Sequence, residues 1–209
     1  MACKSIITIA RQYGSAGREI GEKLAEELGI PCYDKELLER AAEESGISKE
    51  LFENHDEKPN NSFLYSLVMD TYSGGYPTTA FSGLPLNHKI FLAQFNAIKK
   101  VADESPCVIV GRCADYALSE YSNCISVFIH SDMPTKIKRI MEKYDLSEKK
   151  AEEKIVKTDK QRSSYYNYYS NKKWGTATAY NLSVSSGACG IDATVSLLKH
   201  FVELRENEQ

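Results

Sequence analysis

The segment Ile6–Leu28 constrains the fold of this chain more than any other stretch. It starts with an apolar, β-branched run, Ile6–Ile9, which predicts a buried strand. Its second half predicts a helix, since apolar residues recur at helical spacing: Ile20, Leu24 and Leu28. The loop between them is made of small residues: Gly14, Ser15, Ala16 and Gly17. This order is typical of a phosphate-binding site, because backbone N–H groups and the helix dipole both attract an anion.

The loop is a partial match to the Walker A pattern G-x-x-x-x-G-K-[ST]. Gly17 takes the place of the second glycine. Gln12 stands where the pattern has its first glycine, Arg18 where it has lysine, and Glu19 where it has serine or threonine. Taken alone, the loop therefore fits either a phosphate cradle or an ordinary turn between a strand and a helix.

The composition is that of an ordinary soluble protein, with 42% hydrophobic and 26% charged residues, and the 209 residues suit one domain. A net charge of −3 argues against general binding of nucleic acid, which favours a basic surface. No apolar stretch approaches the ~20 residues that cross a membrane, and the first residues lack the long apolar core of a signal peptide. We therefore expect a cytoplasmic protein without membrane contact, whose six scattered cysteines are buried thiols.

Asp34 follows the short extended stretch Pro31–Tyr33. Open parallel sheets bind ligands at the carboxyl ends of their strands, so Asp34 is a candidate acid beside the glycine loop. The default interpretation is that Asp34 caps the next helix, Lys35–Glu44, and the two roles are compatible.

Arg112 and Asp115 follow the apolar strand Cys107–Val110, which ends at Gly111. A fully apolar strand is typical of the centre of a parallel sheet. The two residues therefore form either a surface ion pair or, with Arg112 as the cation, an anion-binding site on the ligand side of the sheet.

The strand Ile125–Ile129 leads into a helical region. Ser131 or Asp132 is expected to cap the helix Pro134–Lys143. We expect the basic side chains of this helix to point away from its buried face: Lys136, Lys138 and Arg139.

A second, basic helix begins after Ser147. On it Asp159 and Arg162 lie three residues apart, so they can pair on one face. Four tyrosines follow: Tyr165, Tyr166, Tyr168 and Tyr169. Three interpretations fit this segment, namely a solvated helix face, an RNA-binding surface, or a lid whose cations close over phosphates.

The rest of the chain completes an alternating pattern. The strand Tyr180–Val184 precedes a polar loop, Ser185–Gly190, and a final helix, Ile191–Leu204, beyond which the chain frays. Earlier, we expect a helix over Asn60–Tyr72 and a loop over Tyr72–Pro85. The alternation of strands and helices predicts an α/β fold, with a mostly parallel five-stranded sheet and helices on both faces.

Five stretches carry a resemblance to a known family: ITIARQYGSAGREIGEKLAEELG, PCYDKELL, CVIVGRCADYAL, TDKQRSSYYNYY with the following Trp174, and YNLSVSS. They are similar to the cytidylate kinase-like proteins, relatives of bacterial cytidylate kinase within the P-loop nucleoside monophosphate kinase group. The resemblance covers essentially the whole chain, and the combination of stretches is specific to this subfamily.

The resemblance implies a three-layer P-loop kinase-like fold in a single domain. Its core would comprise residues 1–44, 87–131 and 176–209, with a helical, acceptor-binding insertion over about 45–86 and a lid over about 132–175. The resemblance also implies ATP with Mg²⁺ as the phosphoryl donor. The acceptor would be a nucleoside monophosphate, with CMP or dCMP favoured.

Residue roles follow from the same resemblance. The phosphate loop would bind the donor through Gly14, Ser15, Ala16, Gly17, Arg18 and Glu19. The expected catalytic residues, two of them on the lid helices, are Arg18, Asp34, Arg139 and Arg162. The expected substrate-binding residues are Asp34, Arg112, Asp115, Asp159 and Tyr166. The expected Mg²⁺ ligands are Glu19 and Asp34.

The departures from the Walker A pattern leave the activity open. Arg18 keeps the charge of lysine but not its shape. Glu19 either ligates Mg²⁺ in place of a hydroxyl or only favours the start of the helix. A nucleoside monophosphate kinase is the first hypothesis, and a non-catalytic nucleotide-binding or sensor protein is the alternative. An RNA-binding module over residues 154–173 is a third hypothesis, and homo-oligomer formation stays open.

Overall fold

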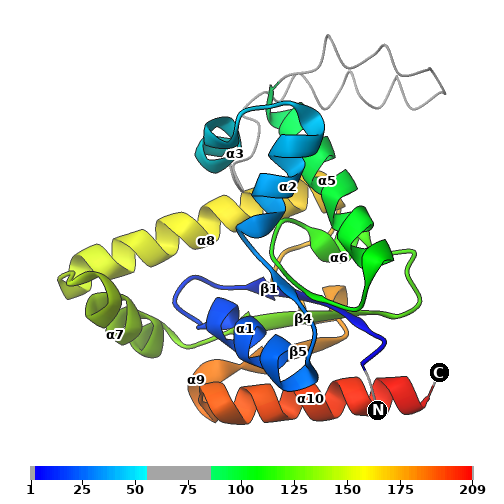
Figure 1. Cartoon of the computed structure of the whole chain (residues 1–209). Coiled ribbons are helices and arrows are strands. Elements are labelled where there is room, and N and C mark those ends of the chain that lie inside the picture. Colours follow the sequence, from blue (N-terminus) through cyan, green and yellow to red (C-terminus); the bar gives the residue numbers. More distant parts are fainter. Residues whose placement is uncertain (1–2, 56–85, 209) are drawn as a thin grey trace.

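A single five-stranded sheet lies at the centre of the computed structural model, which describes residues 3–55 and 86–208 (Figure 1). The strands are β1 (Ile6–Arg11), β2 (Cys32–Tyr33), β3 (Val108–Val110), β4 (Cys124–His130) and β5 (Leu182–Ser185). Their order is β2-β3-β1-β4-β5, and each of these neighbouring pairs is parallel. The predicted sheet is confirmed.

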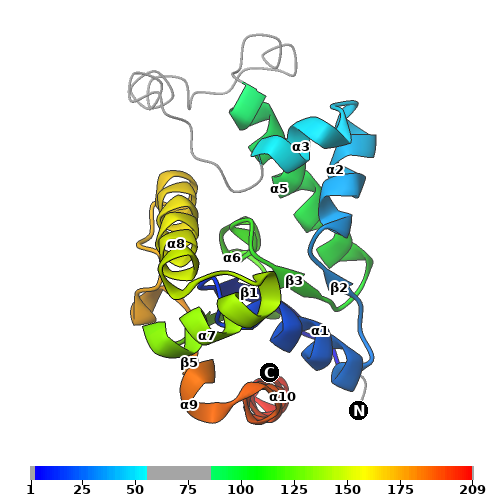
Figure 2. The same ribbon diagram turned by 90° about the vertical axis from the view of Figure 1, so that its left-hand side faces the viewer.

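Helices cover both faces of the sheet, as predicted. Their bounds are α1 (Gly17–Leu28), α2 (Glu36–Ser45), α3 (Lys49–His55), α5 (Leu86–Glu104), α6 (Ala114–Ala117), α7 (Met133–Tyr144), α8 (Glu148–Ser170), α9 (Ser186–Cys189) and α10 (Ile191–Asn207). Figure 2 shows α1 and α10 below the sheet and α2, α5, α6 and α8 above it. The three layers of the expected α/β fold are therefore present.

The central strand β1 shows why the sheet is buried on both faces. Ile7 and Ile9 pack in one apolar cluster with Leu24 of α1. Ile6, whose side chain lies on the opposite face, packs in a second cluster with Leu37 of α2 and Ile98 of α5. Apolar layers on both sides leave the ends of the strands as the places where polar side chains can gather.

The helices α7 and α8 form an arm beside the core (Figure 1). Ile140, Ala151 and Ile155 make a small apolar core between them. The second half of α8 is anchored by aromatic packing: the ring of Tyr169 stacks on Phe91 of α5 with 3.8 Å between centroids. The rings that pack there are buried, namely Tyr165, Tyr166 and Tyr169, so a solvated or RNA-facing role for these three tyrosines is wrong.

The end of the chain differs from the prediction. The segment expected to be a polar loop contains the short helix α9, and α10 continues to Asn207. Glu206 explains the longer helix, since its Oε1 accepts hydrogen bonds from the backbone N–H groups of Lys4 (2.7 Å) and Ser5 (2.9 Å). A helix held at its end by a distant segment does not fray as a free terminus does.

The first arm helix confirms one prediction and contradicts another. Asp132 caps α7, because its carboxylate accepts a hydrogen bond from the Thr135 backbone N–H at 3.1 Å. Lys136 was expected on the solvent side, but its side chain is buried and its Nζ lies 3.2 Å from Asp159 Oδ2. The expectation fails because α7 has two covered sides, one against α8 and one against the loop that precedes α1.

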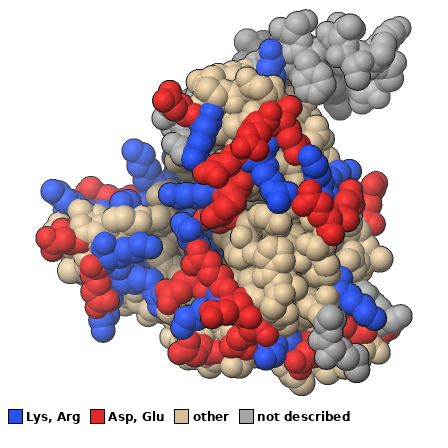
Figure 3. Space-filling view, viewed as in Figure 1, with Lys and Arg blue, Asp and Glu red and all other residues tan. Residues whose placement is uncertain are grey.

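The surface carries charges of both signs. Figure 3 shows Asp and Glu side chains beside Lys and Arg across the face that Figure 1 presents. Ion pairs on the surface include Lys23–Asp192 and Lys100–Glu44, both at 2.6 Å. Within residues 3–55 and 86–208, no helix is both long and apolar enough to span a membrane.

Two remaining predictions are answered only in part. The cysteines are free thiols, as expected, but not all are buried: Cys107 and Cys113 are, whereas Cys189 is exposed. The helix predicted over Asn60–Tyr72 and the loop over Tyr72–Pro85 lie outside the described residues, and so does most of the predicted acceptor-binding insertion.

Candidate active site

A cleft of about 880 Å³ opens at the carboxyl ends of β1, β2 and β3, between the sheet and the arm. Five arginines from five different segments line it: Arg11, Arg18, Arg112, Arg139 and Arg162. Carboxylates also line it, among them Glu19 and Asp34. Parallel α/β sheets place their ligand sites at this edge, and a concentration of guanidinium groups there suits an anionic ligand.

The loop between β1 and α1 has the backbone of an anion cradle. Gly14 (φ 82°) and Ala16 (φ 60°) both adopt the left-handed conformation. The loop is braced from inside, because Ser15 Oγ donates to the Gln12 carbonyl at 2.8 Å. It is braced from behind as well, because Ser186 Oγ of α9 donates to the Ser15 carbonyl at 2.7 Å. The start of α1 therefore faces the cleft with a fixed run of backbone amides.

Arg18, at the Walker lysine position, lies between two carboxylates. Its Nε is 2.8 Å from Glu22 Oε1 and 3.3 Å from Asp34 Oδ2. The hydrogen bond to Glu22 raises the pKa of Arg18 above its usual value, and Asp34 adds to the effect. The side chain is 47% exposed and borders the cleft, so it links the phosphate loop to the end of β2.

Asp34 is an ion-pair partner and not a helix cap. Its Oδ1 accepts a hydrogen bond from Arg112 Nη1 at 3.0 Å, and both side chains are almost fully buried. The N-cap position of α2 is occupied by Lys35 without a capping side chain, so the default interpretation of Asp34 as a cap is wrong. Asp34 does lie at the cleft, as predicted for an acid at this strand end. It supplies the countercharge that the buried guanidinium of Arg112 needs.

The turn after β3 is strained. Gly111, Arg112 and Cys113 all have positive φ, and the latter two, both at 55°, carry side chains that disfavour this conformation. Arg112 Nη1 also donates to the Val110 carbonyl at 3.2 Å, which fixes the guanidinium close to its own backbone. Such strain is concentrated at functional sites, so the turn supports the choice of Arg112 as a site residue.

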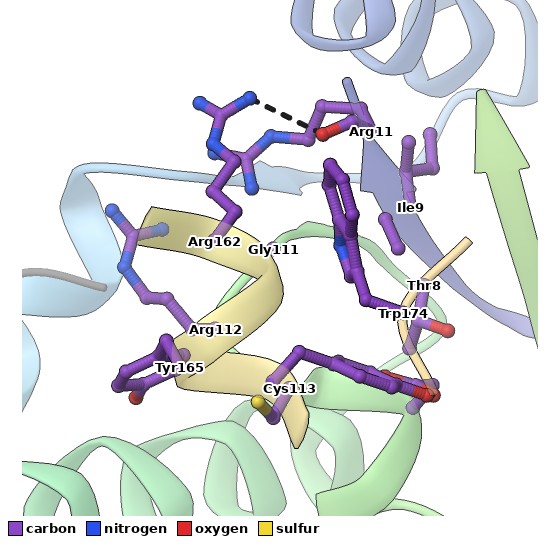
Figure 4. A pocket seen from close by; sticks show the side chains of 12 residues that line it. Thr8, Ile9, Arg11, Gly111, Arg112, Cys113, Arg162, Tyr165 and Trp174 are labelled. Carbon is purple, nitrogen blue, oxygen red and sulfur yellow. Dashed lines mark hydrogen bonds between the residues drawn. The ribbon is translucent and has the colours of Figure 1, made fainter. Parts of the chain in front are cut away.

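Asp115 is not the partner of Arg112 that the sequence offered as one possibility. Its Oδ2 accepts a hydrogen bond from the Tyr166 hydroxyl at 2.6 Å, and both residues are buried. Burial raises the pKa of Asp115, and burial also raises the pKa of Tyr166 above its usual value. The pair joins α6 to α8 beside a small pocket of about 20 Å³, which has room for one water molecule (Figure 4).

Figure 4 shows Arg11, Arg112 and Arg162 around this pocket, with their guanidinium groups turned toward one side. Arg162 Nη1 of α8 donates to the Arg11 carbonyl at 3.2 Å. Arg139 of α7 lies farther along the cleft, with its Nη1 3.5 Å from Glu19 Oε2. The arm therefore places two of the predicted catalytic cations at the mouth of the cleft.

Asp159 contacts the phosphate loop directly. Its Oδ1 accepts a hydrogen bond from the Tyr13 backbone N–H at 2.6 Å, and its Oδ2 pairs with Lys136. The arm is thus hydrogen-bonded through the Asp159 carboxylate to the backbone amide of Tyr13, at the start of the loop.

The two predicted Mg²⁺ ligands face the same cleft. Glu19 pairs with Arg139, and Asp34 pairs with Arg112 and Arg18. The described part of the chain holds no cluster of three or more His, Cys, Asp or Glu side chains that would enclose a metal ion. Two carboxylates beside a phosphate site do suit Mg²⁺, which is commonly held by one or two carboxylates together with substrate phosphates and water.

Arg11 is a site residue that the sequence analysis missed. It ends β1 and lines both the cleft and the small pocket. Its stem crosses Gly17 so closely that a Cβ added there would lie 2.5 Å from Arg11 Cβ. The available signal was its position at the carboxyl end of a strand, directly before the glycine loop.

Similarity to known proteins shows the family and the fold of this chain. A model of the cytidylate kinase-like family matches residues 6–188. An uncharacterized protein from Eubacterium ventriosum, with a solved structure, is 31% identical over 96% of this chain and 99% of its own, with a TM-score of 0.70. No curated protein matches the chain.

More distant solved structures share the fold. A shikimate kinase from Bacteroides thetaiotaomicron is 14% identical, with 95% of this chain and 98% of that one covered and a TM-score of 0.55. A gluconokinase from Sinorhizobium meliloti is 14% identical, with coverages of 100% and 99% and a TM-score of 0.51. The expected P-loop kinase fold is therefore confirmed.

Proposed function

Because the chain belongs to the cytidylate kinase-like family, we propose that it transfers the γ-phosphoryl group of ATP to a nucleoside monophosphate, with CMP or dCMP the favoured acceptor. One observation carries this proposal: five arginines converge on a single cleft between the phosphate loop, the sheet edge and the arm. Phosphoryl transfer depends mainly on positioning and on neutralising charge, and this cleft supplies both.

The donor binds at the phosphate loop. The backbone of Gly14, Ser15, Ala16 and Gly17 cradles the phosphates at the start of α1. Glu19 and Asp34 are the residues that would hold Mg²⁺, which would supply positive charge beside the donor phosphates. Arg18 keeps Asp34 oriented between the loop and the end of β2.

The acceptor binds on the other side of the cleft. Arg112 takes the acceptor phosphate bidentately, and Asp34 fixes the orientation of its guanidinium. Asp115 and Tyr166 line the small pocket together with Arg112, and their hydrogen bond holds α6 against α8. The insertion predicted over about residues 45–86 would set the choice of acceptor; it begins near the end of α2, and of its residues only 45–55 and 86 lie within the described part of the chain.

The arm acts as the lid. Arg139 and Arg162 supply cations to the phosphoryl group in transfer, and Asp159 holds the lid helix on the phosphate loop. Closure of the lid excludes water, which would otherwise hydrolyse ATP without transfer.

A second function, a nucleotide sensor without turnover, is favoured by one specific observation. Arg18, the residue at the Walker lysine position, is engaged with Glu22 and Asp34. If no other cation replaces it, the site binds a nucleotide but transfers no phosphoryl group.

The test is ADP formation from ATP and Mg²⁺ with a panel of acceptors, namely CMP, dCMP, UMP and AMP, with ATP binding measured separately by calorimetry. The kinase predicts turnover with one or two acceptors. The sensor predicts ATP binding without turnover with any of them. Absence of both binding and turnover would contradict both functions.

A further inference from the structure

The first turn of the phosphate loop is built without the Walker glycine. Gln12 occupies that position, and the left-handed residues of the loop are Gly14 and Ala16. Gln12 uses its side chain instead: Oε1 accepts hydrogen bonds from the Ser131 backbone N–H at 3.2 Å and from Lys136 Nζ at 3.3 Å. The loop is therefore connected to the end of β4 and to α7 through one amide oxygen.

The same ammonium group reaches a second contact of the loop. Lys136 Nζ lies 3.2 Å from Asp159 Oδ2, and Asp159 Oδ1 accepts the hydrogen bond from the Tyr13 N–H at 2.6 Å. Lys136 thus orients two side chains, those of Gln12 and Asp159, and Asp159 in turn holds the Tyr13 backbone in place. It also joins α7 to α8 behind the loop.

The stem of Lys136 fits against the loop. A Cβ added at Gly14 would lie 3.0 Å from Lys136 Cβ and 3.2 Å from the Lys136 carbonyl oxygen, so this helix lies directly on the loop backbone. The lysine side chain is 5% exposed. Burial of an ammonium is unfavourable unless it is paired, and an apolar residue would fill the same space without this cost.

We propose that Lys136 is the positioning residue of the phosphate loop, a role that rests on the proposed function of that loop. It acts through Gln12 and Asp159 and fixes the first turn of the cradle to the lid helices. The described residues that line the cleft do not include Lys136, so it sets the shape of the anion site without contacting the anion. Lys136 therefore couples donor binding to lid position, alongside the direct contact between Asp159 and the Tyr13 amide.

The test compares Lys136→Met with Lys138→Met, a change of the same kind at an exposed lysine of the same helix. Thermal unfolding establishes that each variant is folded. Calorimetry with ATP and Mg²⁺ measures donor affinity, and amide hydrogen exchange measures protection of the Tyr13 N–H. We expect Lys136→Met to weaken ATP binding about tenfold or more and to speed Tyr13 exchange, while Lys138→Met changes neither.

A double variant separates positioning from simple neutralisation of a buried charge. Lys136→Met with Asp159→Asn removes both charges, so the melting temperature is expected to return toward the wild-type value while ATP affinity stays low. Recovery of both would overturn the proposal, as would a folded Lys136→Met protein with wild-type ATP affinity and Tyr13 exchange.

Gln12→Gly gives an independent check should Lys136→Met fail to fold. It restores the Walker glycine but removes the amide that Lys136 and Ser131 hold. We expect weaker ATP binding, and unchanged or tighter binding contradicts the proposal. These readouts do not need turnover, so a protein that binds ATP without transferring phosphate refutes the kinase but leaves this test intact.

Discussion

At the scale of single residues, the site depends on how cations are distributed among carboxylates. Arg18 stands between Glu22 and Asp34, whereas Arg11 reaches the cleft from the end of β1. The two arginines flank the phosphate loop, one before it and one after it. From these separate surroundings we propose separate roles, in which Arg11 contacts the phosphates and Arg18 orients Asp34.

Arg11→Gln tests this division. We expect kcat/KM for phosphoryl transfer to fall about 100-fold, because a charge-assisted contact to a phosphate is lost at a site sheltered from water. The matched control is Arg40→Gln, which removes an arginine that pairs with Glu104 away from the cleft. Equal kcat/KM values for Arg11→Gln and Arg40→Gln would show that Arg11 is not part of the site.

Asp115 makes stability depend on pH. Burial raises its folded-state pKa above the unfolded value of about 3.9, so the folded protein binds this proton more tightly. The stabilisation is full below that unfolded pKa and is lost as pH rises through the folded pKa. We therefore expect the free energy of unfolding of wild type, relative to Asp115→Asn, to decrease from pH 4 to pH 7 in urea titrations. A constant or rising difference contradicts a raised pKa.

Residues near strand ends were predictable, but their partners were not. Asp34 and Arg112 follow apolar runs, and the rule for parallel sheets places both at the ligand edge. The partners of Asp115 and Lys136 come from α8, 51 and 23 residues away, and helical periodicity carries no information about such contacts. The same limit hid Arg11, since its neighbours at Gly17 and Arg162 meet it only in the folded chain.

At the scale of elements, α8 combines two functions along one helix. Its first half packs on α7 through Ala151 and Ile155, and its second half packs on α5 through an aromatic cluster. Asp159 and Arg162 lie between these two regions, where the helix meets the phosphate loop. The tyrosines therefore fix the helix that carries Asp159 and Arg162.

Tyr169→Ala measures this anchor. The ring is buried and stacks on Phe91 with an interplanar angle of 8°, so its removal leaves a cavity and is expected to cost about 3 kcal/mol of unfolding free energy. Tyr144→Ala removes a 43% exposed ring from the other arm helix and is expected to cost less than about 1 kcal/mol. Similar losses for both variants would contradict an anchor at Tyr169.

The elements themselves were largely predictable because the strands are apolar and the helices amphipathic. The predicted elements were wrong where a contact with a distant residue overrides the structure that the local sequence favours. Ser186 is bonded to the Ser15 and His130 carbonyls, and this holds α9 in what reads as a polar loop. Glu206 is held by the backbone N–H groups of Lys4 and Ser5, which precede β1, and this contact keeps α10 helical at its end.

At the scale of the whole molecule, the arm helices α7 and α8 contact the loop between β1 and α1, and the proposed function makes this arm the lid of the cleft. The sheet sets Arg11, Asp34 and Arg112 at one edge, and the arm brings Arg139 and Arg162 to the same cleft. The family match and the shared fold support a phosphotransferase, and the residues expected to select the acceptor lie in the predicted insertion.

The most direct measurement is transfer of the labelled γ-phosphoryl group of ATP to CMP by wild type and by Arg112→Ala, with Arg40→Ala as the control. The account predicts labelled cytidine diphosphate with wild type and Arg40→Ala, and a loss of about 100-fold or more with Arg112→Ala at unchanged ATP affinity. Label that stays in ATP or appears only as inorganic phosphate, with CMP and with the other acceptors, would contradict it. Equal transfer by wild type and Arg112→Ala would show that the reaction takes place away from this cleft.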